Sequence, residues 1–103
     1  MDDVFRALGD PTRRQILRLL RSNDLPAGEI AEHFPLAPST LSGHFNVLKS
    51  AGLISPERHG TSIIYSLNVS VFEEAVAALL DVLHVGEAKR TRAVSKEGRE
   101  GSV

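Results

Sequence analysis

Apolar residues recur every three or four positions in the first half of this chain, which is the spacing of amphipathic helices. Asp10 and Pro11 mark one helix start, because Asp is a good N-cap and Pro suits the first helical turn. Gly52 stands where another helix is expected to end. The pattern predicts four helices, over residues 4–8, 12–22, 27–34 and 38–50.

Beyond Gly52 the pattern changes to the alternation of a strand. Residues 53–58 and 63–68 are predicted to pair as a hairpin across the turn formed by residues 59–62. Pro56 lacks an N–H group, which a two-stranded ribbon tolerates because both of its strands are edges. The earlier stretch Asn23–Pro26 is expected to be a turn.

A fifth helix is predicted from Val71 to about Val85, with Ser70 as its N-cap. It carries an apolar seam with the spacing of helix–helix packing, made of Phe72, Val76, Leu79 and Leu83. Residues 86–103 are polar and rich in Lys, Arg, Glu, Gly and Ser, which is typical of disorder. We therefore expect one domain over residues 1–85 and a charged, disordered tail over residues 86–103.

Two short helices joined by a tight turn and followed at once by a hairpin are typical of a winged helix-turn-helix, a mainly α fold with a small β-hairpin wing (α+β). With Leu41, Phe45 and Leu48 facing the core, helical geometry turns a set of short polar residues outward. That set is Ser39, Ser42, Gly43 and Asn46, with Thr40 and Lys49 on the flanks. A polar outer face is by itself most often only solvated. The hairpin that follows favours a surface that enters the major groove of double-stranded DNA.

The hairpin tip and one pair of arginines add further candidate contacts with DNA. The tip holds Arg58, His59 and Thr61, which could contact a neighbouring backbone or the minor groove. Arg13 and Arg14 begin the second helix, where they could contact phosphate or pair with a local carboxylate.

Composition narrows the class of protein further. The 103 residues are 42% hydrophobic and 24% charged, which is ordinary for a soluble globular domain. The chain has no cysteine, no long apolar run and no signal-peptide pattern, so we expect a cytoplasmic protein without membrane contact. Its net charge of −1 does not by itself indicate a nucleic-acid-binding protein, since such proteins are typically basic. It shows no nucleophile motif, phosphate loop or metal-hydrolase signature, so we do not expect an enzyme.

Four segments in this order together resemble the ArsR/SmtB family, and especially its autorepressor (SdpR-like) branch. They are FRALGDPTRRQILRLL (5–20), GEIAEHF (28–34), STLSGHFNVLKSAGLI (39–54) and ERHGTSIIYSLN (57–68). The resemblance implies a homodimeric winged-helix repressor that binds a roughly palindromic operator and often regulates its own gene. It also implies that the first and fifth helices build the dimer interface, here Val4, Phe5, Leu8, Phe72, Val76, Leu79 and Leu83.

The resemblance assigns the recognition-helix positions residue by residue. Ser39, Thr40, Ser42, Gly43 and His44 occupy these positions, and Asn46 and Lys49 follow on the same helix. Two residues depart from the pattern. Ala37 stands where the family often has a capping serine, and Gly43 stands where relatives frequently carry a longer polar or basic residue.

Many members of this family are released from DNA by a metal ion. The third-helix Cys-x-Cys site is absent, because Pro26-Ala27-Gly28 stands there. The fifth-helix site is half present, since Glu73, His84 and Glu87 could supply three ligands for zinc or nickel across an antiparallel helix pair. A histidine that is interfacial or exposed near a helix end explains the same residues without metal, so no cofactor is expected. A metal-responsive repressor stays one alternative. A protein-interaction module that has lost DNA recognition stays another, favoured by Gly43 and the near-neutral charge.

Overall fold

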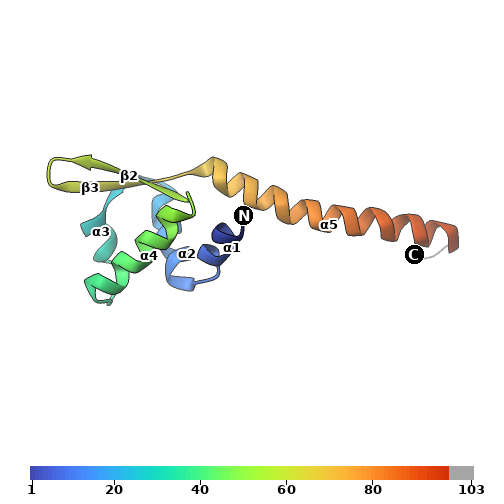
Figure 1. The fold of residues 1–103 in the computed structure, drawn as a ribbon, viewed down its shortest axis with the longest axis horizontal. Coiled ribbons are helices and arrows are strands. Elements are labelled where there is room, and N and C mark those ends of the chain that lie inside the picture. The colour runs from blue at the N-terminus through green and yellow to red at the C-terminus, as the bar shows by residue number, and fades with distance from the viewer. Residues whose placement is uncertain (98–103) are drawn as a thin grey trace. The chain divides into compact units, whose positions relative to one another are not determined.

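The computed structural model describes the backbone of residues 1–97 and the side chains of residues 1–84 (Figure 1). In chain order the elements are α1 (Asp2–Leu8), α2 (Pro11–Leu20), β1 (Leu25–Pro26), α3 (Ala27–Ala31), α4 (Pro38–Ser50), β2 (Ile54–His59), β3 (Ser62–Leu67) and α5 (Val69–Glu97). The chain divides into two compact units, residues 1–72 and the residues from Glu73 onward. The first unit has the predicted mainly α architecture with a β-hairpin wing.

The first unit folds around the apolar faces that the sequence predicted. Leu41, Phe45 and Leu48 of α4 are all buried, and α4 packs against α1, α2 and β2. The ring of Phe45 stacks on that of Tyr65 of β3, with 4.7 Å between the ring centroids. Burial raises the pKa of the Tyr65 hydroxyl above its usual value. This packing fixes which side of α4 remains for solvent or a partner.

The sheet has three antiparallel strands in the order β1-β3-β2. The prediction that residues 23–26 form only a turn was wrong for Leu25 and Pro26, which pair with Tyr65 and Ile64. A strand of two residues is too short to show the alternation of apolar and polar residues, so the sequence pattern could not predict it. β3 is therefore the central strand rather than an edge. Pro56 lies on β2, which is an edge strand as its missing N–H group requires.

Gly52 connects the end of α4 to the wing. Its φ of +78° lies in the left-handed region. The Gly52 N–H group donates to the Lys49 carbonyl at 2.9 Å, and the Leu53 N–H group donates to the Leu48 carbonyl at 3.0 Å. These two bonds are those of a Schellman motif, and Leu48 and Leu53 are both buried beside it. The predicted helix end is confirmed, and it sets the direction in which the hairpin leaves α4.

Replacing Gly52 with alanine is expected to lower the free energy of unfolding by about 1 kcal/mol or more, because a Cβ atom disfavours positive φ. Gly28→Ala is the matched control, since a Cβ at Gly28 would meet nothing within 4 Å and its φ is not positive. Urea denaturation of both variants measures the difference. Equal stability of the two variants would contradict the role of Gly52.

The bounds of α5 differ from those predicted. The helix begins at Val69, and the hydroxyl of Ser70 donates to the Asn68 side chain at 3.2 Å, so Ser70 lies inside the helix and is not its N-cap. Its other end is at Glu97, whereas an end near Val85 was expected. The residues after Gly86 are rich in Ala, Glu, Lys and Arg, which are strong helix formers, and one glycine costs only about 1 kcal/mol. Residues 98–103 of the predicted tail lie outside the described residues.

Among the described helices, none combines the length and apolar character that a membrane crossing needs.

Candidate nucleic-acid interface

One face of α4 carries the polar residues that the sequence assigned to DNA recognition. All six are exposed as predicted, and they are Ser39, Thr40, Ser42, Gly43, Asn46 and Lys49. Within the described part of the chain none of their side chains makes a hydrogen bond or an ion pair. Their hydroxyl, amide and ammonium groups are therefore available to base edges and phosphates.

The N-terminus of α4 lies at one end of this face. Ala37 is its N-cap and provides no side-chain hydrogen bond, while Pro38 occupies the first helical turn. The weaker cap that the sequence predicted is confirmed. The N–H groups at the start of a helix have no acceptor within the helix, and together with the helix dipole they attract phosphate oxygens.

Gly43 lies in the middle of the exposed face. A Cβ atom built there would meet nothing within 4 Å, so the fold leaves room for a larger side chain. Glycine inside a helix costs about 1 kcal/mol relative to alanine. Its presence thus brings bare helix backbone to the centre of the polar surface, where another molecule can approach closely.

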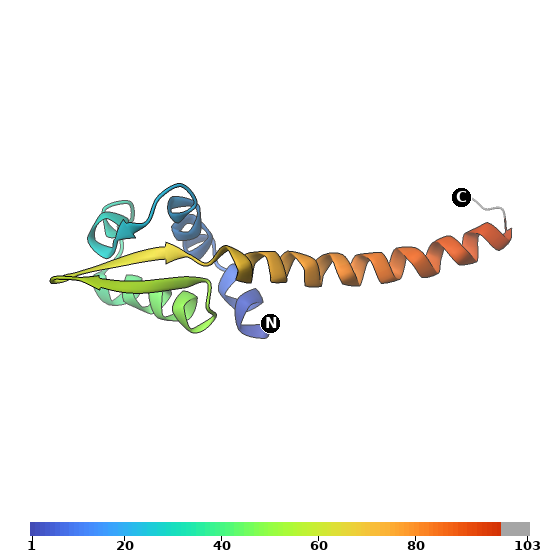
Figure 2. The same ribbon diagram turned by 90° about the horizontal axis from the view of Figure 1, so that it is seen from above.

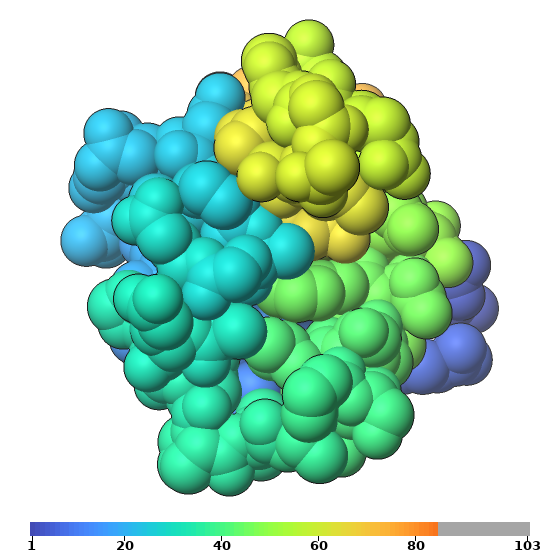
Figure 3. All heavy atoms as spheres, turned by 90° about the vertical axis from the view of Figure 1, so that its left-hand side faces the viewer, coloured from blue at the N-terminus to red at the C-terminus, as the bar shows by residue number. Residues whose placement is uncertain are grey.

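The hairpin tip lies beside this surface. Figures 1 and 2 show the β2–β3 hairpin projecting past α3 and α4, and Figure 3 shows α3, α4 and the hairpin on one face of the molecule. Arg58, His59 and Thr61 are exposed as predicted. The imidazole of His59 lies 3.6 Å from the carboxylate of Glu57. The recognition face and the wing can therefore contact one duplex together.

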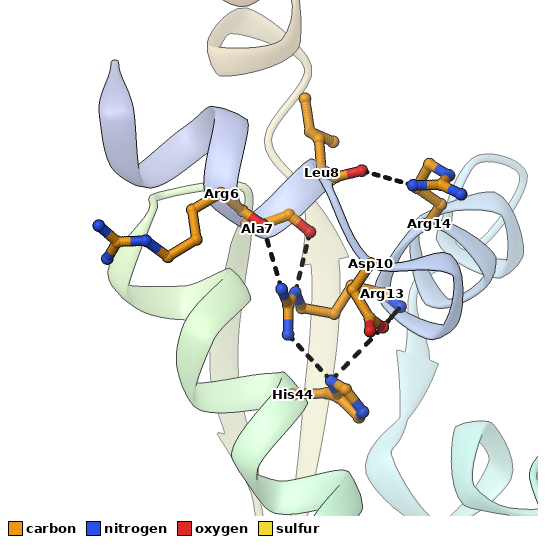
Figure 4. Close-up of polar contacts among 7 residues, drawn as sticks. All are labelled: Arg6, Ala7, Leu8, Asp10, Arg13, Arg14 and His44. Atoms are coloured by element: carbon orange, nitrogen blue, oxygen red, sulfur yellow. Dashed lines mark hydrogen bonds and ion pairs between the residues drawn. The ribbon is translucent and has the colours of Figure 1, made fainter.

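Arg13 and His44 belong to a cluster that joins α1, α2 and α4 (Figure 4). This cluster is separate from the exposed polar face of α4. The Nη1 atom of Arg13 lies 3.2 Å from Nδ1 of His44, which is 3.8 Å from the carboxylate of Asp10. Arg14 donates to the Leu8 carbonyl at 2.8 Å. The sequence suggested phosphate or carboxylate partners for both arginines. The structure places their guanidinium groups on backbone carbonyls at the end of α1, contacts that residue types alone do not reveal, and a contact of Arg14 with phosphate stays a prediction.

Asp10 caps α2 as predicted and carries a shifted pKa. Its carboxylate accepts the backbone N–H of Arg13 at 3.0 Å, and this bond is the main cause that lowers the pKa of Asp10. Partial burial opposes the shift, while the positive charge of the Arg13 side chain adds to it. The charged form of Asp10 is therefore the one that stabilises the fold.

Asp10→Ala is expected to cost about 1 kcal/mol of unfolding free energy at neutral pH. Asp10→Asn keeps a good cap but cannot titrate. Because the pKa of Asp10 is lower in the folded state, the stabilisation is complete above the unfolded pKa of about 3.9 and is lost as pH falls through the folded value. Denaturation between about pH 2 and pH 6 should show the wild type losing stability relative to D10N on the acid side. A constant difference would contradict this linkage.

Comparison with known proteins decides the family. Residues 10–55 match the family described as "Bacterial regulatory protein, arsR family". The Transcriptional repressor SdpR of Bacillus subtilis is 45% identical over 87 residues, which cover 84% of this chain and 97% of SdpR. The chain belongs to the arsR family of bacterial regulatory proteins.

Two further relatives agree with this assignment. The HTH-type transcriptional regulator NmtR of Mycobacterium tuberculosis is 37% identical over 94 residues, covering 84% of this chain and 75% of NmtR. The solved structure of an ArsR-like transcriptional regulator from Rhodococcus sp. RHA1 has a TM-score of 0.78 at 28% identity, covering 98% of this chain and 93% of that one. This arsR-family protein is thus a winged helix-turn-helix DNA-binding transcriptional regulator, and its relatives are regulators rather than enzymes.

The residues expected at a dimer interface of this arsR-family regulator differ in exposure. Val4 is buried inside the first unit, while Phe5, Leu8 and Phe72 are partly exposed. On α5 the side chains of Val76, Leu79 and Leu83 are exposed, and so is Leu80. Leu80 follows Val76 by four residues and belongs to the same helix face, although the predicted seam omitted it. The apolar face of α5 is therefore wider than the seam predicted from the sequence.

The candidate metal ligands of the arsR-family protein lie on α5. Glu73 and His84 are exposed, and their eleven-residue separation places them about 16 Å apart along the helix. The side chain of Glu87 lies outside the described residues. Among the side chains that the structure describes, no three His, Asp or Glu residues are grouped to hold a metal ion. His33, the remaining histidine, is exposed after α3.

Proposed function

We propose that this arsR-family regulator is a sequence-specific transcriptional repressor that binds a palindromic operator as a homodimer. In this proposal α4 enters the major groove and the hairpin tip contacts the adjacent backbone or minor groove. The observation that carries the proposal is the exposed face of α4, whose polar side chains have no internal partner and lie beside the wing. The name of SdpR, a transcriptional repressor, supports repression.

The homodimer rests on the apolar face of α5. Leu79 and Leu83 are 57% and 55% exposed, and Val76 and Leu80 extend the same face. A second copy of this chain would cover these side chains and place two copies of α4 on successive half-sites, about one helical turn of DNA apart. The resemblance to the autorepressor branch supports an operator upstream of the protein's own gene. The protein would act in the cytoplasm. The proposal requires no cofactor.

The metal-responsive alternative makes a different demand. It requires Glu73 of one copy to meet His84 and Glu87 of a second copy, because Glu73 and His84 are too far apart to share an ion within one straight helix. Zinc or nickel would then weaken operator binding. Metal-indifferent binding supports the simple repressor.

Replacing Ser39 and Ser42 together with alanine is expected to weaken operator binding about tenfold or more, because each lost hydrogen bond to DNA contributes about 0.5–1.5 kcal/mol. The operator is taken as the tightest-binding duplex recovered from a pool of random sequences and of DNA upstream of the gene. Affinity for random DNA and the melting temperature should change little, since both hydroxyls are exposed and unbonded.

The matched control for this pair is Ser22→Ala with Ser55→Ala, which removes two exposed hydroxyls outside α4. It should bind the operator as the wild type does in a fluorescence anisotropy titration. An unchanged affinity of the Ser39 and Ser42 variant would overturn the assignment of α4 as the recognition helix.

A further inference from the structure

We infer that Arg13 and His44 are positioning residues that tie the recognition helix to the end of α1, and that they do not contact DNA themselves. The inference rests on the proposed function, because it concerns how α4 is presented to an operator. It assigns to both residues a role other than the DNA contact that the sequence suggested.

Each of the three nitrogen atoms of the Arg13 guanidinium group has a partner (Figure 4). Its Nε atom donates to the Ala7 carbonyl at 2.9 Å, and Nη2 donates to the Arg6 carbonyl at 3.1 Å. These carbonyls belong to the last turn of α1, where the helix dipole favours a positive charge, and the Arg6 carbonyl also accepts the Gly9 N–H at 3.1 Å. Nη1 reaches His44 of α4 at 3.2 Å. One planar cation therefore joins α1, α2 and α4.

The contact with Arg13 requires one particular tautomer of the His44 ring. A guanidinium group can only donate, so Nδ1 of His44 must accept and its proton must stand on Nε2. The side chain of His44 is only 17% exposed, which leaves little of the ring for a phosphate. The Asp10 carboxylate, 3.8 Å from Nδ1, also accepts the Arg13 backbone N–H, so the cap of α2 belongs to the same cluster.

The position of His44 in α4 explains why this tie matters for recognition. His44 follows Ser42 by two residues and precedes Asn46 by two, so the tie acts on the middle of the recognition face. A small rotation or shift of α4 moves these side chains away from their base edges. Contacts with phosphates carry no sequence information and form on random DNA as well, so a shift of α4 should weaken binding to the operator more than binding to random DNA.

Two variants of Arg13 separate positioning from phosphate contact. Arg13→Lys keeps the charge, but an ammonium group cannot span two carbonyls and an imidazole in the geometry of the planar fork. Positioning predicts that R13K binds the operator about tenfold more weakly, with random-DNA affinity unchanged. Arg13→Gln should also bind the operator more weakly, with the slope of log affinity against log salt unchanged. Phosphate contact predicts a nearly intact R13K, and an R13Q slope reduced by about one with parallel loss on random DNA.

Variants of His44 test the acceptor. Asparagine can place an amide oxygen near the position of Nδ1, whereas leucine fills similar space without an acceptor. His44→Asn is expected to keep most of the operator affinity, and His44→Leu is expected to lose about tenfold.

Arg18→Lys and Arg18→Gln are the matched controls for the two Arg13 variants, because exposed Arg18 donates to Gln15 within α2. Both should bind the operator as the wild type does.

The experiment is an anisotropy titration of the full chain on operator and random duplexes at several salt concentrations, with ¹⁵N spectra of the His44 ring in the free protein. The spectra should show Nδ1 as the acceptor and a changed Nδ1 resonance in R13K. A proton on Nδ1, or a resonance that R13K leaves unchanged, overturns the inference. So does equal weakening by His44→Asn and His44→Leu. If the wild type does not distinguish operator from random DNA, the proposed function fails, while the spectra still decide whether the tie exists.

Discussion

Replacing Leu79 and Leu83 with glutamate is expected to make the protein monomeric and to weaken operator binding by about 100- to 10,000-fold. Both side chains are more than half exposed on α5, so the change removes apolar surface available to a second copy without emptying the core of the first unit. Charges facing one another across the interface would add repulsion. Binding weakens because each monomer then holds one half-site alone, without the avidity of the linked pair.

The matched control is Ala77→Glu, which adds a charge on the side of α5 that carries Glu73, Glu74 and Asp81. That variant should remain dimeric and bind the operator as the wild type does. Sedimentation measures the assembly and anisotropy measures binding. A Leu79 and Leu83 variant that still sediments as a dimer would place the interface elsewhere on the chain.

Gly43→Glu is expected to weaken operator binding by several kcal/mol, on the order of 100-fold or more, while the protein stays folded. A side chain at this position meets nothing within 4 Å, and glutamate is a better helix former than glycine, so stability should hold or rise by up to about 1 kcal/mol. The loss comes from a bulky negative charge where the bare helix backbone would approach the DNA.

Asn23→Asp is the control for the added charge. Asn23 is exposed and precedes β1, near the end of the sheet opposite the hairpin tip. That variant should bind with nearly wild-type affinity at 0.15 M salt, because exposed charges separated by more than about 8 Å are largely screened. If both variants weaken binding equally, net charge rather than a close approach at Gly43 governs the interaction.

The recognition face could be predicted because its signals are local. The spacing of Leu41, Phe45 and Leu48 determines which side of α4 is buried, and the opposite side follows from helix geometry. Asp10 and Gly52 likewise act on their own neighbours, as a cap and as a left-handed residue. Their positions in the sequence were enough to place both helix ends.

The contacts of Arg13 that hold α4 in place could not be predicted in the same way. Arg13 bonds to backbone carbonyls of Arg6 and Ala7, and every residue type offers such a carbonyl. Its third partner, His44, lies 31 positions away, so only the packing of α2 against α4 brings the two together. The pairing of Leu25 with Tyr65 was missed for a related reason, because a two-residue strand exists only through its partner.

The central claim is that the face made by α4 and the hairpin reads a DNA sequence. Anisotropy of the full chain at one salt concentration, on labelled operator and on random duplex of equal length, tests it most directly, with zinc and nickel each added in parallel. We predict that the operator is bound at least 1000-fold more tightly than random DNA, as typical specific sites are, and that neither metal changes the affinity. Equal affinity for both duplexes would contradict the claim.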